Sequence, residues 1–519
     1  MNALQHNHGN KADAEGRAAR SRERVFKDRR ALVAIDLGAE SCRVSLLRRR
    51  SNTVEIMLVH RFPNAPTKKG NSLRWDISRI LAGVEEGLRG CADIATEGIA
   101  AIGVDGWAVD YVRLGSDGSP LGDPFCYRDE RNLVAQREVH AKLPPDRLYS
   151  LTGAQVLPLN TVYQLHADSI FNIDQSSRWI NLPEYVLYCL GADRVSEYTN
   201  ATHTALLGVR DQTWCPEIFT AAGLDIEAAP PVVRPGSDIG KVRGELATLP
   251  ALKNTRLIAP ACHDTASAIA GIPALGNDWA FISSGTWSLV GCVLDSPQTS
   301  DTARDKNFSN EGGVGGKTYF LKNVNGMWLL RQCIEYWQSQ GTAWTIEQLV
   351  KNSASLGTPE HLLDVDDPDL LLPDNMPERI HAQLKRTGSF DRALSAPELA
   401  NLIFRSLAAR YAAVLRDIAE ITGRKFSRLF IVGGGSKNTL LNQLTAKATN
   451  LEIIRGPIEC ATIGNFAIQL AALAGDFDVR TGVDGVSVAE FAQVIAAEAQ
   501  ESILATSGQI TVREDLKAV

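Results

Sequence analysis

The fold is decided by residues 31–47, ALVAIDLGAESCRVSLL, in which an apolar run ends at Asp36, turns at Gly38 and is followed by a second, alternating run. A third run of this kind follows at 54–62, VEIMLVHRF. Short runs that are rich in β-branched residues and separated by turn residues are typical of antiparallel strands. We therefore predict that the ordered chain opens with three strands joined by tight turns.

The next segment, residues 76–93, changes to helical spacing. Its apolar residues fall on one helix face: Ile77, Ile80, Leu81, Val84 and Leu88. The chain then returns to strand at 99–105, IAAIGVD, and at 109–114, VDYVRL. Three strands, a helix and further strands predict an α/β fold, in which helices pack on a mixed sheet.

The pattern of strand, glycine turn and strand returns at 280–294, AFISSGTWSLVGCVL. We predict a helix from about Asn325 to Trp337. The longest helical pattern covers 396–422 and ends at Gly423, which is placed as a C-terminal cap. The second half of the chain therefore uses the same kinds of element, in a similar order, as the first.

A last strand and glycine turn at 427–435, SRLFIVGGG, precedes another helical stretch. The two halves thus predict two related domains, with a hinge near 271–278, where Gly and Pro interrupt the pattern. We expect a disordered tail at 1–29, a first domain at 30–272, a second domain at 273–485 and a C-terminal extension at 486–519.

The bulk properties restrict the class of protein. The chain has 519 residues, more than one hydrophobic core usually supports. Its net charge of −6 gives no reason to expect nucleic-acid binding, and no apolar run reaches the roughly 18–20 residues of a membrane span. The nine cysteines are odd in number and form no CxxC pair, which indicates free thiols in the cytoplasm. We expect a monomer or homodimer.

Glycine-centred turns are the first candidate binding elements. Three follow strands at 36–41, 284–288 and 433–436, and a fourth, at 104–107, is placed nearer a substrate. Such turns let backbone N–H groups approach a phosphate, although a tight hairpin alone explains each one. Their presence in both halves favours phosphate binding. None matches the Walker pattern or a GxGxxG that opens a helix, so ATP would be bound without a P-loop lysine.

The segment 262–268, CHDTASA, lies between a predicted strand and a predicted helix. Asp264 is a candidate general base that accepts a proton from an attacking hydroxyl. Alternatively, Asp264 or Thr265 caps the helix. Purely structural explanations also remain open: Trp107 could be a core residue, and His263 could be a hydrogen-bonded imidazole. In the same way, Asp36 could simply begin a turn, and Arg43 could be a solvated charge on a strand.

Eight motifs together resemble those of the FGGY carbohydrate kinases, over about residues 31–475. In chain order they are DLGAESCRVSL, GVDGWAVDYVRL, YRDERN, HDTASAIAGIP, SSGTWSLVG, NEGGVGGKTYFLKNVNGMWLLRQC, IVGGGSKNTLLNQL and GPIECATIGN. Within that family they are most similar to the rhamnulokinase branch. The chain departs from the usual branch pattern at Cys42, at Gly106 and Ala108, and at Arg331.

The resemblance implies a two-domain actin-like (ribonuclease-H-like) ATPase fold with ATP, Mg²⁺ and a sugar in the inter-domain cleft. It implies ATP-dependent phosphorylation of L-rhamnulose to L-rhamnulose 1-phosphate. The departures at Gly106 and Ala108 leave L-fuculose, L-ribulose or xylulose as alternative substrates. A non-catalytic actin-fold protein that binds sugar and nucleotide is a second alternative.

The resemblance also implies roles for individual residues, beginning with Asp264 as the catalytic base and Asp36 as a contact of Mg²⁺, directly or through water. The implied sugar-binding residues are Trp107, Ala108, Asp110, His263, Thr265 and Asn323. The implied ATP-binding residues are Ala39, Glu40, Ser41, Cys42, Arg43, Gly285, Thr286, Arg331, Gly434 and Gly435.

Overall fold

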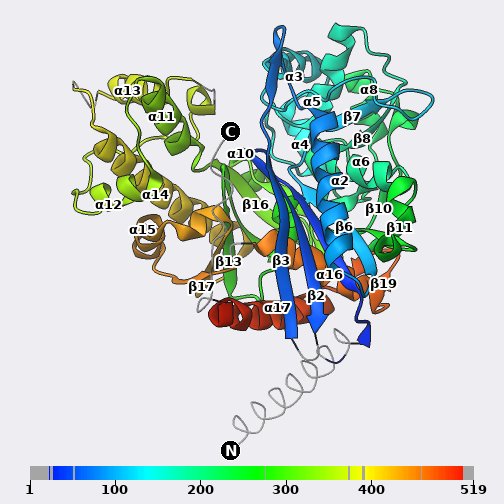
Figure 1. The fold of residues 1–519 in the computed structure, drawn as a ribbon. Helices are drawn as coiled ribbons and strands as arrows, with labels where there is room; N and C mark the ends of the chain where they lie inside the picture. Colours follow the sequence, from blue (N-terminus) through cyan, green and yellow to red (C-terminus); the bar gives the residue numbers. More distant parts are fainter. Residues whose placement is uncertain are drawn as a thin grey trace, which may run out of the picture.

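The structure is a computed structural model that describes residues 23, 27–50, 53–274, 276–371, 374–388, 392–457 and 459–506. The tail that we expect to be disordered, 1–29, therefore lies mostly outside the described residues. The two halves of the chain lie side by side (Figure 1), with helices α2, α3, α6 and α8 on the right and helices α11 to α15 on the left.

The N-terminal half is built on a six-stranded sheet in the order β11-β12-β6-β1-β2-β3. Its strands are β1 (Ala31–Leu37), β2 (Ser41–Arg50), β3 (Thr53–Pro63), β6 (Ile99–Gly106), β11 (Ser237–Lys241) and β12 (Arg256–Ala259). The first three strands are antiparallel, as predicted. Strand β6 adds parallel to β1, which places Asp105 beside Asp36.

One long helix, α2 (Ile77–Ile94), covers part of this sheet. It begins where the Asp76 carboxylate accepts a hydrogen bond from the Arg79 N–H at 3.0 Å. Of the predicted apolar face, Ile77, Ile80, Val84 and Leu88 are buried, and Leu81 is partly buried against the same core. The remaining strands of this half are short: β4 (Thr67–Lys69), β5 (Ser72–Arg74), β7 (Tyr111–Leu114), β8 (Arg178–Asn181), β9 (Ser196–Glu197) and β10 (Val232–Val233). Its remaining helices are α3 (Arg131–Lys142), α4 (Pro145–Thr152), α5 (Thr161–Ala167), α6 (Leu182–Leu190), α7 (Tyr198–Ala201), α8 (Pro216–Ala222) and α9 (Asp264–Ala270).

The C-terminal half has its own six-stranded sheet, in the order β15-β16-β14-β13-β17-β18. Its strands are β13 (Trp279–Ser284), β14 (Trp287–Leu294), β15 (Ser309–Gly312), β16 (Thr318–Asn325), β17 (Arg428–Val432) and β18 (Glu452–Arg455). Its helices are α10 (Asp301–Asp305), α11 (Trp328–Ser339), α12 (Ile346–Ser353), α13 (Met376–Arg386), α14 (Ala396–Thr422) and α15 (Thr439–Thr449). Helix α14 ends at Gly423 in the left-handed conformation, φ +68°, as predicted.

The two sheets repeat one topology. In each, the first two strands (β1 and β2, or β13 and β14) pair antiparallel and a third strand extends the meander. On the other side of the first strand, β6 or β17 pairs parallel with it; the C-terminal half differs in that β15 comes before β16 in the chain and lies at the sheet edge. This repetition confirms that both halves follow one plan and that the protein has the α/β, two-domain actin-like fold.

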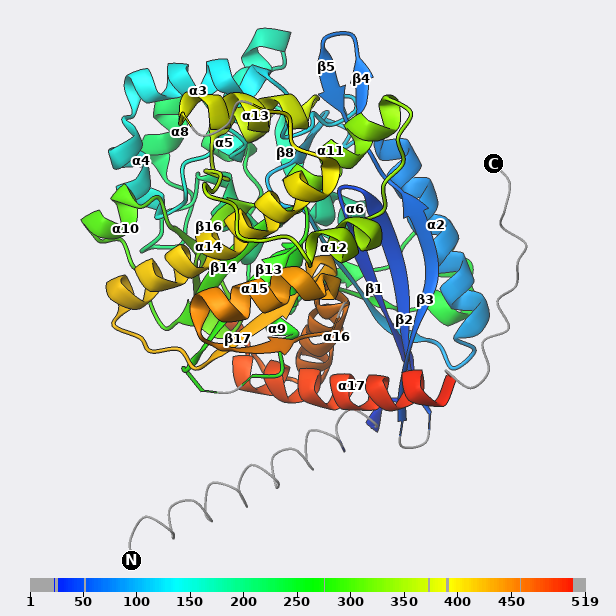
Figure 2. The same cartoon turned by 90° about the vertical axis from the view of Figure 1, so that its left-hand side faces the viewer.

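The halves meet at their base through helices. Helix α16 (Cys460–Leu473) follows the C-terminal sheet but packs on β1, β6 and α9 of the N-terminal half. There the Asn465 amide donates to the Asp105 carboxylate at 2.6 Å, and the Gln469 amide donates to the Val33 carbonyl at 2.9 Å. Helix α17 (Gly485–Thr506) runs below both sheets (Figure 2), after the short hairpin β19 (Phe477–Asp478) and β20 (Gly482–Val483).

Three local expectations are wrong. The helix predicted from Asn325 begins instead at Trp328, because β16 pairs with β14 as far as Asn325. The predicted turn at 104–107 is mostly strand, since β6 continues to Gly106. The strand predicted at 109–114 is confined to β7, which lies outside the main sheet and pairs with β8.

All nine cysteines are free, and every one except Cys189 is buried. Among the described helices, none combines the length and apolar character needed to cross a bilayer.

Candidate active site

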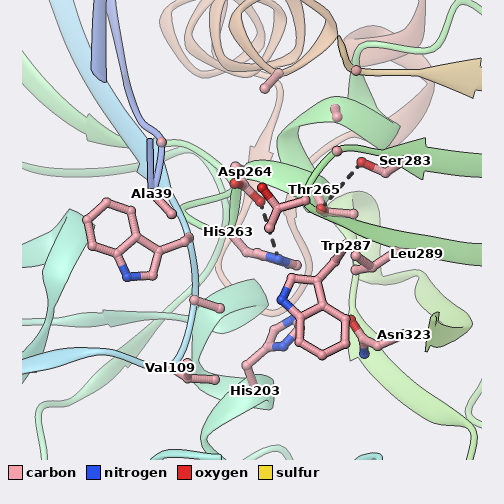
Figure 3. Close-up of a pocket in the computed structure, with 18 of the residues that line it drawn as sticks. Ala39, Val109, His203, His263, Asp264, Thr265, Ser283, Trp287, Leu289 and Asn323 are labelled. Carbon is pink, nitrogen blue, oxygen red and sulfur yellow. Dashed lines mark hydrogen bonds and ion pairs between the residues drawn. The ribbon is translucent and has the colours of Figure 1, made fainter. Parts of the chain in front are cut away.

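A cavity of about 540 Å³ lies between the two sheets. It forms where β1, β13 and β17 end, because the turns after these strands all face the same space. Figure 3 shows its lining, with Ala39 and Val109 on one side and Ser283, Leu289 and Asn323 on the other. Most of the residues implied by the resemblance line it: Asp36, Ala39, Glu40, Ser41, Arg43, Trp107, Ala108, His263, Asp264, Thr265, Gly285, Thr286, Asn323 and Gly434.

Asp264 is the first residue of α9 and projects into this cavity (Figure 3). The N-cap is His263, so the alternative in which Asp264 or Thr265 caps the helix is wrong. Burial, reinforced by the negative charge of Asp36, raises the pKa of Asp264 to about 7, although hydrogen bonds from Thr265 oppose the shift. A carboxylate with such a pKa can take up a proton near neutral pH.

Asp36, near the end of β1, forms an ion pair and is not simply a turn residue. Its Oδ2 accepts a hydrogen bond from Arg43 Nη1 at 2.7 Å, and Arg43 is therefore not a merely solvated charge. Burial raises the pKa of Asp36 in spite of Arg43. Asp105, directly beside it in β6, is fully buried, and burial together with Asp36 raises its pKa well above the ordinary value.

Trp107 both packs in the core and lines the cavity. Its ring lies 4.5 Å from that of Trp75, and both indoles donate to Asp110 Oδ2, at 3.0 and 2.6 Å. Asp110 itself is fully buried and is not among the cavity-lining residues. Its place is thus behind Trp107, whose orientation it fixes.

Val109 has φ +73°, which is rare for a β-branched residue. The strained peptide is held because Thr161 Oγ1 donates to the Val109 carbonyl at 2.7 Å and the Gln164 amide donates at 3.3 Å. Strain that the surroundings maintain in this way is common at binding sites. Here it directs the segment from Trp107 to Val109 along the cavity wall.

The opposite wall is provided by the C-terminal half. Thr265 Oγ1 lies 3.5 Å from Ser283 Oγ across the boundary between the halves. The Asn323 backbone and side-chain amides both donate to Gln155 Oε1, at 2.9 and 3.0 Å. These polar contacts connect the two halves next to the cavity.

A second cavity of about 470 Å³ adjoins the first and is lined by Gly285, Thr286, Gly434, Gly435 and Arg331. Glu40 lines both cavities, pairs with Arg331 and accepts a hydrogen bond from Thr286 Oγ1 at 3.1 Å. The Cys42 side chain, in contrast, is fully buried and lines neither cavity. Two connected cavities provide room for a nucleotide and a second substrate.

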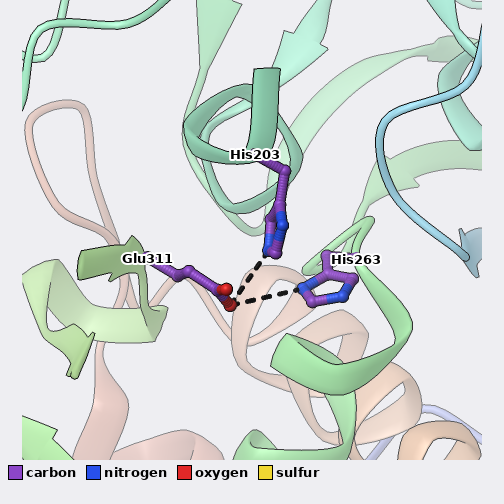
Figure 4. Close-up of side chains that lie close together, drawn as sticks. All are labelled: His203, His263 and Glu311. Carbon is purple, nitrogen blue, oxygen red and sulfur yellow. Dashed lines mark ion pairs between the residues drawn. The ribbon is translucent and has the colours of Figure 1, made fainter. Parts of the chain in front are cut away.

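The lining residues that sequence reasoning did not name as site residues include Gln155, His203, Trp287 and Glu311. His203, His263 and Glu311 form a group whose nitrogen and carboxylate atoms lie within 4.8 Å of one another, a set able to hold a metal ion (Figure 4). Burial and the neighbouring His203 lower the pKa of His263 well below its usual range. Glu311 belongs to the NEGG motif, which is the one signal that could have identified it.

Known proteins resemble this chain over most of its length. Residues 31–271 match the N-terminal domain, and residues 280–473 the C-terminal domain, of the FGGY family of carbohydrate kinases. A rhamnulokinase of Enterococcus faecalis is 36% identical over 450 residues, covering 86% of this chain and 90% of the relative. One of Klebsiella pneumoniae is 35% identical over 474 residues, covering 90% and 93%.

Solved structures show the same fold at lower identity. A gluconate kinase from Lactobacillus acidophilus matches with a TM-score of 0.71 and 17% identity, covering 92% of this chain and 98% of that one. A Plasmodium falciparum glycerol kinase with ADP matches with a TM-score of 0.68 and 13% identity, covering 92% and 99%. The motifs, the paired sheets and the cleft thus agree with these matches, and the chain belongs to the FGGY family of carbohydrate kinases.

Proposed function

We propose that this carbohydrate kinase transfers the γ-phosphoryl group of ATP to the 1-hydroxyl of L-rhamnulose, giving L-rhamnulose 1-phosphate. The observation that carries the proposal is the convergence of Asp264 with two glycine turns, at Gly285 and Gly434, on one cavity. Relatives named rhamnulokinase, 32–36% identical over most of the chain, support the choice of sugar.

Asp264 is the proposed general base. It accepts the proton of the attacking sugar hydroxyl while the hydroxyl oxygen bonds to the γ-phosphorus and the bond from that phosphorus to the β,γ-bridging oxygen breaks. Phosphoryl transfer needs positioning and charge stabilisation more than covalent help, so one carboxylate at the nucleophile is sufficient. We propose His263 and Thr265, on either side, as sugar contacts, together with Trp107, Ala108 and Asn323. Asp110 supports this set by orienting Trp107.

The proposed phosphate contacts come from both halves. On the N-terminal side they are the turn from Ala39 to Ser41 and Arg43, which line the first cavity. On the C-terminal side they are Gly285, Thr286 and Gly434. Arg331 and Gly435 line the second cavity, where we place the rest of the nucleotide. Because the whole of Cys42 is buried and it pairs with Leu37 and Phe62 in the sheet, we leave it out of the proposed phosphate contacts.

The acidic residues fit a magnesium ion. Burial is the main cause that raises the pKa values of Asp105 and Asp264, and the negative charge of Asp36 raises both further, so the three carboxyl groups lie close enough to repel one another. Mg²⁺ prefers carboxylate oxygens and substrate phosphates, and Asp36 would hold it directly or through water. The ion would supply charge neutralisation at the β- and γ-phosphates.

A panel of ketoses tests the choice of sugar. Purified protein with MgATP is given L-rhamnulose, L-fuculose, L-ribulose and xylulose, ADP release is measured, and the product is identified by NMR. The highest kcat/KM with L-rhamnulose, phosphorylated at O1, is the expected result. A preference for another ketose would assign the protein to that sugar, as the departures at Gly106 and Ala108 allow.

We also propose domains at 30–272 and 273–485 flanked by a tail at 1–29 and an extension at 486–519. We further propose a monomer or homodimer and a cytoplasmic location, in agreement with nine free thiols. Limited proteolysis and light scattering test the first two of these points.

A further inference from the structure

The side chains of His203 and Glu311 form a pair at the wall of the cavity, beside His263 (Figure 4). We propose that this pair recognises two adjacent hydroxyl groups of the ketose, remote from the hydroxyl that is phosphorylated. The inference rests on the proposed function, because it names the part of the sugar that this site selects.

The buried pair offers polar atoms to a ligand. Glu311 is only 2% exposed, yet neither of its carboxylate oxygens accepts a hydrogen bond within the described residues. His203 Nε2 approaches Glu311 Oε2 at 2.9 Å as an ion pair and also lacks a well-formed hydrogen bond. Buried acceptors without donors cost free energy. Oε1 can accept a hydrogen bond from one hydroxyl, and Oε2, which also faces His203, has a second lone pair for a neighbouring hydroxyl.

The position of the pair separates it from the chemistry. His263 lies between Glu311 and the proposed base, because its Nδ1 is 3.9 Å from Glu311 Oε2 and its Nε2 is 3.4 Å from Asp264 Oδ1. One imidazole ring thus stands between the base and the Glu311 carboxylate. A hydroxyl at Asp264 and hydroxyls at Glu311 must therefore belong to different carbons of the same sugar.

A metal ion is the competing occupant of this group. Zinc bound tetrahedrally, with bonds of about 2.0–2.2 Å, keeps neighbouring ligand atoms roughly 3.3–3.5 Å apart. The 2.9 Å separation of His203 and Glu311 is shorter and is that of a direct ion pair. The geometry consequently favours a pair that receives hydroxyl groups over one that holds a metal.

The test combines variants with deoxy sugars. Glu311→Gln keeps the volume but removes the charge, and charge-assisted hydrogen bonds contribute enough that kcat/KM for the ketose should fall about 10- to 100-fold. The affinity for an ATP analogue, measured by calorimetry, should not change, which also verifies folding. The matched control is Glu138→Gln, which breaks a surface pair with His166 of the same 2.9 Å length and should leave kcat/KM unchanged.

Ketoses lacking the hydroxyl at C3, C4 or C5 then identify the contact. In the wild type, two adjacent positions should each show a large loss of kcat/KM, and Glu311→Gln should reduce that loss, since the same interaction is already weakened. His203→Gln should act in the same direction.

The outcomes are distinct. A wild type that phosphorylates no ketose overturns the proposed function and this inference together. An active wild type whose Glu311→Gln variant keeps its kcat/KM, or shows the same deoxy-sugar losses, overturns only this inference. So does stoichiometric zinc in the purified wild type that is lost from Glu311→Gln and His203→Gln, because a metal would then occupy the pair.

Discussion

Replacing Asp264 by Asn should lower activity and raise stability at the same time. The amide cannot act as a general base, so kcat should fall roughly 10²- to 10⁴-fold while ATP binding changes little. Because His263, not Asp264, is the N-cap of α9, the replacement removes no capping bond. A large loss of activity would therefore not be explained by unfolding of this helix.

The gain in stability follows from the pKa. Asp264 has a pKa of about 7 in the folded protein, against an ordinary value of 3.8. This difference of about 3 units corresponds to at most about 4 kcal/mol. The side chain is 34% exposed, so solvent screening reduces the expected effect to about 1–2 kcal/mol. The contribution of protonated Asp264 to the free energy of unfolding is fully present below pH 3.8. It is lost as the pH rises through 7, because the buried carboxylate must then ionise.

The assay is thermal unfolding of both proteins at pH 4 and pH 8, together with coupled ADP release. The Asn variant should match the wild type at pH 4 and unfold at a higher temperature at pH 8. Asp278→Asn is the control of opposite sign, since hydrogen bonds from Arg428 and Ser427 lower the pKa of Asp278 to about 2. Near wild-type turnover of Asp264→Asn, or equal stability at pH 8, would refute the reasoning.

Three further predictions address the nucleotide, the pH profile and closure. A Cβ at Gly285 or Gly434 meets nothing closer than 3.8 Å. Their Val variants should therefore fold, and the KM for ATP should rise far more than the KM for the sugar. A Cβ at Gly435 would lie 2.0 Å from Ser284 Oγ, so Gly435→Ala should instead lower the melting temperature. Below pH 7, kcat/KM for the ketose should fall about tenfold per pH unit as Asp264 becomes protonated; a flat profile down to pH 5 would exclude it as the base. Small-angle scattering should give a smaller radius of gyration with ketose and a non-hydrolysable ATP analogue together; an unchanged radius despite binding of both would indicate a preformed cleft.

The sequence predicts those elements whose conformation is determined by residues close together in the chain. Strands β1 and β2 alternate around the turn at Gly38, and helix α14 has both a regular apolar face and Gly423 as its cap. The same local information fails near Asn325. There the pairing of β16 with β14, made with residues more than thirty positions away, extends the strand over a segment with helical spacing.

The candidate site is predictable only in part for the same reason. Asp264 and the glycine turns lie inside recognisable motifs at strand ends. His203, in the turn that follows α7, and Glu311, in β15, are 108 positions apart and meet only after these elements pack together. No spacing rule connects such residues, so a buried ion pair of this kind becomes visible only in three dimensions.

We expect the close contact between α9 and α16 to determine how the cleft closes. A Cβ at Gly464 would lie 1.8 Å from the Ser267 carbonyl oxygen, and one at Gly271 would lie 2.2 Å from the Cys460 carbonyl oxygen, so the two backbones touch. Close backbone packing leaves few side chains to rearrange when one helix turns on the other. We therefore expect rotation about this crossing, to which the loop at 271–278 is directly joined, rather than about the loop alone. Because Asp264 begins α9, such a rotation would change its distance to the turns after β13 and β17, which would couple closure to assembly of the site.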